Sequence, residues 1–284
     1  MKRSRSTIWV VVLLIMLLAA ACTAPTVQSQ ADAYNNQGIA HYERGEYQEA
    51  IDDYTEAIRL DPNHAMAYGN RGDVYRELGE YEKAMADLDK AIELDPDYAE
   101  AYAARGNVYD ELGELDRAMA DYDRAIELDP HNAFAYRNRG VAYTRQGDLE
   151  QALADFDRAV ELDPAYAIAY ASRADVNSQL GEFEKAIEDY DRFIEMTSND
   201  VLLAMGYTNR ALAYALIEEY EQAVADLDRA IELEPSDPLG YFWRALVLAE
   251  LGRSTEAGSD AERVCDLAPE GELCQQLETM GLID

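Results

Sequence analysis

A segment of 34 residues recurs along this chain and constrains its fold more than any other feature. The most regular copy runs from Ala133 to Tyr166 and contains two stretches of helically spaced apolar residues with a turn between them. Self-similarity at a fixed period is typical of solenoids, in which each unit packs on its neighbours and the stack presents an extended surface. The repeat therefore predicts stacked helix pairs and a binding protein.

Small and turn-forming residues stand at fixed places in each copy. A tyrosine near the start of the first helix is followed four residues later by glycine or alanine, which allows the second helix to approach closely. A glycine ends the first helix and a proline follows the second. Glu218 replaces that glycine in the sixth copy, so we expect a strained or reshaped turn there. Ser198 replaces the proline just before three extra residues, Val201 to Leu203, and there we expect an irregular junction with a longer second helix or loop.

This pattern of tyrosine, glycine, alanine and proline, at this period, resembles the tetratricopeptide repeat. The resemblance covers Ala31 to Gly271. It implies an all-α fold, namely a right-handed superhelical solenoid of antiparallel helix pairs whose first helices line the concave face. The seven units in register are 31–64, 65–98, 99–132, 133–166, 167–200, 204–237 and 238–271.

Two charged places keep step with the repeat. The seventh place is Gln37 in the first unit and arginine in the others, and the twenty-third place is always aspartate. Because a buried arginine needs an anionic partner, we expect a ladder of internal ion pairs; the alternative is a row of arginines that grips an anionic ligand. The residues are Arg71, Arg105, Arg139, Arg173, Arg210 and Arg244, with Asp53, Asp87, Asp121, Asp155, Asp189, Asp226 and Asp260.

The amino terminus is typical of an export signal. Three cations precede an apolar run from Ile8 to Ala21, which has the length of a signal peptide's apolar region rather than that of a spanning helix. Small residues then lead into Cys22, and this resembles a bacterial lipoprotein signal, with Ala19 where leucine is usual. The resemblance implies removal of residues 1–21, lipidation of Cys22 and a flexible tether over residues 22–30, at a membrane of the cell envelope. The alternative is an ordinary signal peptide cleaved at a nearby alanine.

The charge of the chain restricts its partners. Aspartate and glutamate total 57 against 24 lysines and arginines, which gives a net charge of -33. Nucleic-acid binding needs a basic face, so that class is excluded. A charged partner is expected to be basic; the alternative is that the acids only keep the surface well solvated.

The sequence contains no constellation for catalysis. The three histidines, His41, His64 and His131, lie far apart, and no phosphate loop, nucleophile elbow, zinc-ligand spacing or EF-hand occurs. We therefore expect neither enzymatic activity nor a cofactor or metal.

Binding is expected where the copies differ, at the inward-facing places of the first helices. Polar groups in the early units can hydrogen-bond an extended peptide, and apolar anchors in the last two are the kind that dominate interface energies. The candidates are Asn36, Asn70, Asp73, Arg76, Asn107, Asp110 and Asn138, and then Leu212, Leu216, Phe242, Trp243 and Leu246. The alternative for the apolar set is that the cap or the next helix covers it.

The last segment, residues 272–284, is amphipathic, and we expect it to cap the apolar flank of the final unit. Cys265 and Cys274 flank the connection to this segment. In an exported protein, this pair favours a disulfide that pins the cap. The alternative is two free buried thiols.

Together these features predict a membrane-tethered scaffold or adaptor of the bacterial cell envelope that binds a protein or peptide on its concave face. The resemblance implies work such as the assembly of pili, outer-membrane proteins or cell-wall enzymes. Two alternatives remain open. One is a ligand-sensing accessory subunit that regulates a separate envelope enzyme, and the other is a receptor that takes a cation or small solute in an acidic groove.

Overall fold

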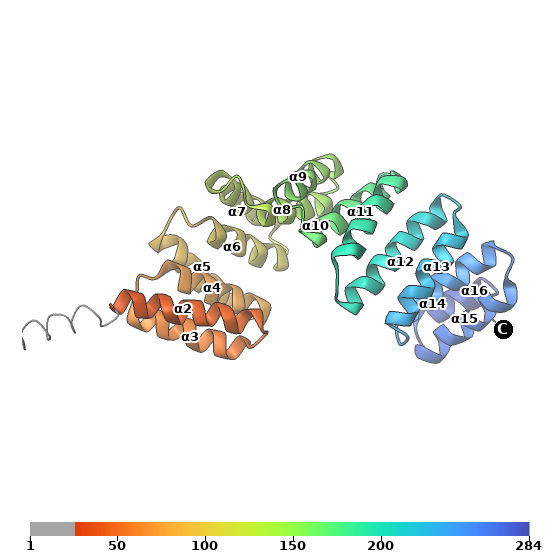
Figure 1. Cartoon of the computed structure of the whole chain (residues 1–284), viewed down its shortest axis with the longest axis horizontal. Helices are drawn as coiled ribbons and strands as arrows, with labels where there is room; N and C mark the ends of the chain where they lie inside the picture. Colours follow the sequence, from red (N-terminus) through yellow and green to blue (C-terminus); the bar gives the residue numbers. More distant parts are fainter. Residues whose placement is uncertain (1–25, 284) are drawn as a thin grey trace, which may run out of the picture. The chain divides into compact units, whose positions relative to one another are not determined.

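The structure is a computed structural model that describes residues 26–283 (Figure 1). These residues form 15 helices and no strand, and neighbouring helices pair along the chain, so the predicted all-α fold of helix pairs is confirmed. None of the described helices is both long enough and apolar enough to cross a bilayer. The chain divides into an N-terminal body, residues 1–128, and a C-terminal body, residues 129–284, which are described in turn.

The N-terminal body contains three helix pairs, one for each of the first three repeats. In each pair the two helices pack together, and within this body the second helices of the first two pairs also pack on the first helix of the next pair. The helices are α2 (Val27–Glu43), α3 (Tyr47–Leu60), α4 (Ala65–Glu77), α5 (Tyr81–Leu94), α6 (Ala99–Glu111) and α7 (Leu115–Leu128).

The C-terminal body contains four helix pairs and a final short helix. First helices of successive repeats are neighbours here, α8 with α10, α10 with α12 and α12 with α14, so they form one continuous wall. The helices are α8 (Ala133–Gln146), α9 (Leu149–Leu162), α10 (Ala167–Gln179), α11 (Phe183–Met196), α12 (Asp200–Leu216), α13 (Tyr220–Leu233), α14 (Pro238–Glu250), α15 (Ser254–Leu267) and α16 (Glu272–Thr279).

Small residues bring the two helices of a pair close together. A Cβ atom added at Gly140 on α8 would lie 2.7 Å from Cε1 of Phe156 on α9, which is closer than side chains tolerate. Ala152, the small residue on α9, is fully buried. The recurring glycine and alanine are therefore packing requirements of the pair.

The three extra residues of the sixth repeat lengthen its first helix. The second helix of the fifth repeat, α11, keeps the same 14 residues as its counterparts, whereas α12 has 17 and begins at Asp200. Asn199 caps α12, because its side-chain oxygen accepts a hydrogen bond from the N–H of Leu202 at 3.0 Å. The junction is irregular, but the expected lengthening of the second helix is corrected to a lengthening of the next first helix.

The turn at Glu218 is strained, as its sequence predicts. Its φ angle is 63°, and it is the one non-glycine residue with positive φ in the described part of the chain. Gly147, at the same place of the fourth repeat, has φ of 83°. The turn keeps the glycine conformation with a side chain that disfavours it.

The amino-terminal prediction needs one correction. Val27 to Gln30 belong to α2 and not to a flexible tether. Thr26 caps this helix, since its Oγ1 accepts a hydrogen bond from the N–H of Ser29 at 3.1 Å. Cys22 and the predicted signal peptide lie outside the described residues.

Arginines of the seventh place form the ladder of ion pairs that the repeat predicts. Arg105 donates from Nε and Nη2 to the two carboxylate oxygens of Asp121, both at 2.8 Å. It also donates from Nη1 to Asp89, on the second helix of the preceding repeat, at 2.7 Å. The pairs within repeats are Arg71–Asp87, Arg105–Asp121, Arg139–Asp155, Arg173–Asp189, Arg210–Asp226 and Arg244–Asp260.

The first repeat lacks the arginine–aspartate ion pair. Gln37 replaces the arginine, and Oδ2 of Asp53 is buried without a hydrogen-bond partner among the described residues. Nε2 of His41 lies 3.5 Å from that oxygen. Burial raises the pKa of Asp53, and the charge of His41 opposes this effect.

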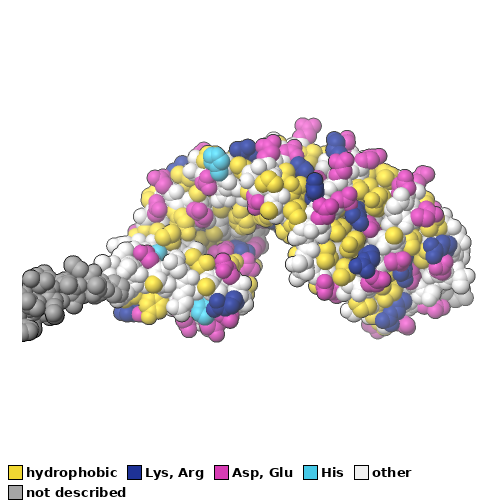
Figure 2. Space-filling view, viewed as in Figure 1, with side chains coloured by type: hydrophobic (Ala, Val, Ile, Leu, Met, Phe, Trp, Pro, Cys, Tyr) yellow, Lys and Arg dark blue, Asp and Glu magenta, His cyan; other side chains and the backbone are white. Residues whose placement is uncertain are grey.

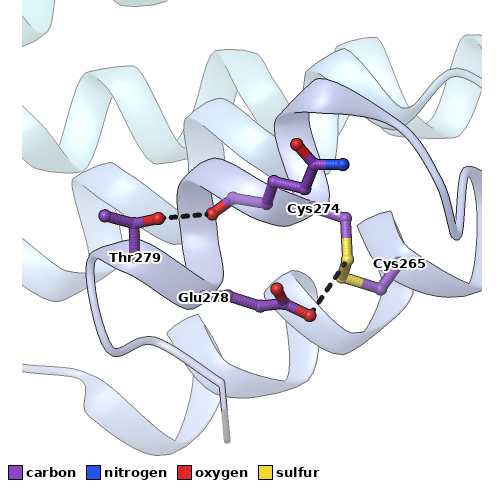
Figure 3. Close-up of a disulfide and its surroundings, with 5 residues drawn as sticks. Cys265, Cys274, Glu278 and Thr279 are labelled. Carbon is purple, nitrogen blue, oxygen red and sulfur yellow. Dashed lines mark hydrogen bonds between the residues drawn. A yellow bond between two sulfur atoms is a disulfide. The ribbon is translucent and has the colours of Figure 1, made fainter.

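The cap is held to the last repeat by covalent and apolar contacts. A disulfide joins Cys265 on α15 to Cys274 on α16 (Figure 3). Leu277 of α16 is fully buried in a cluster with Phe242 of α14 and Val264 of α15. The chain then turns at Gly281, and Leu282 packs against the apolar clusters of the last two repeats.

Candidate functional site

An apolar groove lies on the C-terminal body, on the wall made by α12 and α14 and beside the segment after α16. It encloses about 730 Å³. Its lining, which we call the C-terminal groove, is Leu212, Ala215, Leu216, Tyr220, Trp243, Leu246, Val247, Ala249, Glu250, Met280 and Leu282. A hollow of this size with mostly apolar walls is suited to side chains of a ligand or partner.

Equivalent places of successive repeats align to form the groove. Leu212 on α12 and Leu246 on α14 both occupy the ninth place of their windows, where the fifth repeat has Asp175. Since α12 and α14 pack on each other, these leucines lie along one strip. At this place the wall therefore changes from an acidic residue in the fifth repeat to apolar residues in the sixth and seventh.

The groove combines an anchored aromatic ring with exposed aliphatic side chains. The ring of Trp243 is half-buried and meets the ring of Phe242 edge-on, with centroids 5.1 Å apart. Leu216 and Met280, by contrast, are 62% and 57% exposed. Large apolar side chains exposed next to one another mark interaction surfaces, and a fixed tryptophan among them is a frequent binding hot spot.

The charged residues around the groove are acidic. Glu250 is the charged residue in its lining, and Glu218 and Glu219 lie on the turn between Leu216 and Tyr220. Acidic side chains are also spread over the face of the molecule shown in Figure 2, with basic ones among them. A segment that enters the groove therefore meets carboxylates at its edges, which favours basic residues beside its apolar ones.

Four of the predicted apolar residues, Leu212, Leu216, Trp243 and Leu246, come together in the groove. Phe242 does not, and this prediction is corrected. Its side chain is 3% exposed and packs in the core between α14, α15 and α16. The cap covers the Phe242 side of α14, while the Trp243 side stays open.

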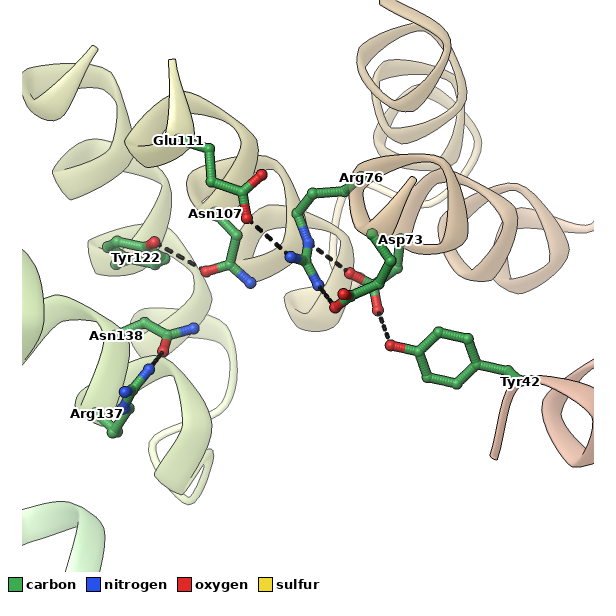
Figure 4. Close-up of polar contacts among 9 residues, drawn as sticks. Tyr42, Asp73, Arg76, Asn107, Glu111, Tyr122, Arg137 and Asn138 are labelled. Atoms are coloured by element: carbon green, nitrogen blue, oxygen red, sulfur yellow. Dashed lines mark hydrogen bonds and ion pairs between the residues drawn. The ribbon is translucent and has the colours of Figure 1, made fainter. Parts of the chain in front are cut away.

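The polar residues predicted on the inner face of the early repeats already bond to one another (Figure 4). Asp73 accepts hydrogen bonds from the hydroxyl of Tyr42 at 3.3 Å and from Nε of Arg76 at 2.9 Å. Nη1 of Arg76 reaches Glu111 on the next first helix at 2.9 Å. Burial raises the pKa of Tyr42, and the charge of Asp73 adds to the effect. These groups tie first helices together, so a ligand that used them would have to displace internal bonds.

The other predicted amides differ in accessibility. Nδ2 of Asn70 donates to Oδ1 of Asn35 at 3.0 Å, and Asn107 accepts from the hydroxyl of Tyr122 at 2.9 Å. Asn138 is buried and Asp110 is half-buried. Asn36 is exposed on α2. They are spread over α2, α4, α6 and α8 and do not belong to the lining of the C-terminal groove.

The repeats of this chain match models of a known protein family. Models of the tetratricopeptide repeat match residues 31–64, 53–86, 133–166 and 167–200, and a TPR repeat model matches residues 72–113, 106–147 and 211–252. The chain belongs to the tetratricopeptide repeat family. Tetratricopeptide repeat proteins generally mediate protein–protein interactions and are generally non-catalytic scaffolds. No curated protein matches the sequence.

Solved tetratricopeptide repeat structures share the fold. The APC/C hetero-tetramer Cut9–Hcn1 is similar with a TM-score of 0.74 and 19% identity, over 88% of this chain and 49% of that one, so this chain spans about half the length of that protein. PilF of Pseudomonas aeruginosa is similar with a TM-score of 0.67 and 20% identity, over 77% of this chain and 98% of that one. YrrB, described as a TPR protein with an unusual peptide-binding site, has a TM-score of 0.52 and 27% identity, over 66% of this chain and 95% of that one.

The repeat pattern does not predict several of the residues that line the groove of this tetratricopeptide repeat protein. Met280 and Leu282 belong to the tail after α16, outside the repeat, so no equivalent place points to them. Tyr220 and Val247 line the groove from places that are mainly structural in other repeats. Within the described residues, no group of histidine, cysteine, aspartate or glutamate is arranged to hold a metal ion.

Proposed function

We propose that this protein is a scaffold of the bacterial cell envelope and that it binds a partner polypeptide in the C-terminal groove. The observation that carries the proposal is the cluster of accessible apolar side chains around Trp243. Burying apolar surface stabilises a complex by about 25 cal/mol per Å². Leu216 and Met280 are the most exposed of these side chains, so a partner that covers them buries the most apolar surface there. The bound segment carries apolar side chains flanked by lysine or arginine, because the groove is bordered by Glu250, Glu218 and Glu219.

Two further observations support the proposed scaffold function. YrrB, whose structure is described as containing an unusual peptide-binding site, is similar to 66% of this chain at 27% identity. The amino terminus resembles a lipoprotein signal ending at Cys22. A lipid on that cysteine would hold the repeats at a membrane surface, where the scaffold brings its partner to the envelope.

Selection of random dodecapeptides displayed on phage tests the groove as the binding site. The purified full chain is compared with two variants that each place a glutamate at an exposed apolar position of α12. Leu216→Glu acts inside the groove, and Val201→Glu acts outside it at a site of matched exposure, 60% against 62%. We expect the wild type and Val201→Glu to enrich the same peptides, with apolar residues beside lysine or arginine, and Leu216→Glu to enrich none of them.

Two outcomes would contradict the groove as the site. One is equal enrichment of these peptides by Leu216→Glu and the wild type. The other is enrichment of peptides without apolar residues. The lipid anchor is tested separately with Cys22→Ser: loss of membrane association supports it, and unchanged tight association contradicts it.

A further inference from the structure

Arg137 on α8 is an arginine whose charge is not neutralised by an ion pair in the described part of the chain. Its Nη1 donates to the side-chain oxygen of the buried Asn138 at 3.1 Å (Figure 4). Its Nε is buried and has no hydrogen-bond acceptor. The arginines of the ladder, in contrast, each hold a carboxylate. The residue as a whole is half-buried, and its terminal nitrogens are not among the buried polar atoms without a partner, so they can donate to an acceptor from outside the chain.

Asp175 on the neighbouring helix α10 offers the complementary group. Its Oδ1 accepts hydrogen bonds from the hydroxyl of Tyr190 at 2.5 Å and from Nδ2 of Asn209 at 3.5 Å. The side chain remains accessible at the surface. Surrounding protein atoms desolvate the carboxylate and raise its pKa, while Tyr190 and the charge of Arg137 oppose the rise. Arg137 and Asp175 lie on neighbouring first helices, α8 and α10, and no ion pair joins them in the described part of the chain.

The two groups lie on the wall that leads to the C-terminal groove. Helices α8, α10, α12 and α14 are successive neighbours. Asn209, which contacts Asp175, is followed on α12 by Leu212 and Leu216 at spacings of three and four residues, so the three side chains share one face of that helix. A polypeptide that lies in the groove can therefore extend along this face towards Asp175 and Arg137.

We infer that Arg137 and Asp175 form a subsite for the main-chain N–H and C=O of one residue of the segment bound in the C-terminal groove. The guanidinium donates to the carbonyl oxygen of that residue, and the carboxylate accepts from its N–H. An extended segment presents these two groups on the same side, and they carry no net charge. A carboxylate ligand would satisfy Arg137 but would be repelled by Asp175, which makes it the poorer match. Because main-chain amides of a helix are bonded internally, the segment is extended at this point.

This inference rests on the proposed function, and both are tested with one dodecapeptide selected on the wild-type chain. Its affinity is measured by calorimetry for the wild type, Arg137→Gln, Asp175→Asn and the control Arg263→Gln. Arg263 lies on the second helix α15 of the same body, over the ring of Tyr241. We expect binding about tenfold weaker for Arg137→Gln, about fivefold weaker for Asp175→Asn and unchanged for the control.

Ester analogues of the same peptide identify the residue whose N–H is bound. Each analogue replaces one main-chain N–H by oxygen and so removes one donor. We expect one position at which the ester weakens binding to the wild type about fivefold but leaves binding to Asp175→Asn unchanged. Melting temperatures of all variants are compared first, so that a loss of affinity is not a loss of folding.

Three results would overturn the subsite. Binding to Asp175→Asn that is stronger than to the wild type would indicate a carboxylate ligand. Ester effects that are the same in both proteins would remove Asp175 as the acceptor, and unchanged affinity of Arg137→Gln would remove Arg137 as the donor. If Leu216→Glu abolishes binding in any of these cases, the groove stands and only the subsite fails; if Leu216→Glu binds the peptide normally, the groove itself fails.

Discussion

The guanidinium of Arg173 holds two carboxylates from successive second helices. Its Nε and Nη2 donate to Asp189 of its own repeat at 2.8 and 2.6 Å, and its Nη1 donates to Asp157 of the preceding repeat at 2.6 Å. Asp189 is buried, whereas the side chain of Asp157 is 60% exposed. Arginine suits this task because its planar fork presents several donors in fixed directions. The ladder therefore links neighbouring repeats as well as the helices of one pair.

Arg173→Ala should lower the free energy of unfolding by about 3–5 kcal/mol, because it leaves the carboxylate of Asp189 buried and unpaired. Asp157→Ala removes only a largely exposed partner and should cost about 1 kcal/mol or less. Urea unfolding followed by circular dichroism compares the two. Equal stability of Arg173→Ala and the wild type would show that the ladder does not stabilise the fold.

Gln37→Arg should stabilise the first repeat. It supplies Asp53 with the guanidinium that six other repeats have and gives the buried Oδ2 a hydrogen bond. We expect a gain of about 1–2 kcal/mol, seen as slower hydrogen exchange of the α2 and α3 amides, a local measure suited to repeat arrays. The gain should vanish in the Asp53→Asn background; if it persists there, the arginine acts elsewhere.

Glu218→Gly should stabilise the turn between α12 and α13. The φ angle of 63° costs a non-glycine residue about 1–2 kcal/mol, and glycine adopts it freely. Part of this gain is offset by the greater flexibility of glycine in the unfolded chain, so an increase of about 1 kcal/mol is expected. Thermal unfolding measures it. The reverse change at the same place of another repeat, Gly147→Glu, should lower stability; an increase there would exclude backbone strain as the cause.

The disulfide between Cys265 and Cys274 should hold the wall of the groove in place. Mass spectrometry without reductant should find neither thiol free. Replacing both cysteines with serine should lower the stability of the cap by about 2–3 kcal/mol and should weaken peptide binding, because Met280 and Leu282 follow α16 directly. Unchanged hydrogen exchange in α16 after the replacement would mean that apolar packing alone holds the cap.

The repeat pattern specifies the helix pairs and the Arg173–Asp189 type of contact, because each depends on residues that recur in step. The third partner, Asp157, recurs in step as well, but an acidic residue at a solvent-facing place looks like ordinary surface charge, so the pattern does not single it out as a partner. The neighbouring residues Phe242 and Trp243 show a second limit. They point in different directions on α14, and only the position of the cap decides that the phenylalanine is covered and the tryptophan open.

The sequence did contain a signal for Phe242. Its place in the window is occupied by small or buried residues in other repeats, such as Gly69, Ala103 and Ala171. Arg137 stands at the same place, and this departure distinguishes it from the arginines of the ladder. Met280 and Leu282 could not be assigned in this way, because the tail has no counterpart in the repeats.

Fluorescence of Trp243 tests the C-terminal groove most directly. The sequence has two tryptophans, Trp9 and Trp243, so Trp9→Phe leaves the groove residue as the only one. Titration of this full-chain variant with a selected dodecapeptide should shift the emission of Trp243 to shorter wavelength, because apolar side chains displace water from its ring. The shift should saturate at the affinity measured by calorimetry. Saturable binding by calorimetry with no change in Trp243 emission would contradict the groove as the binding site.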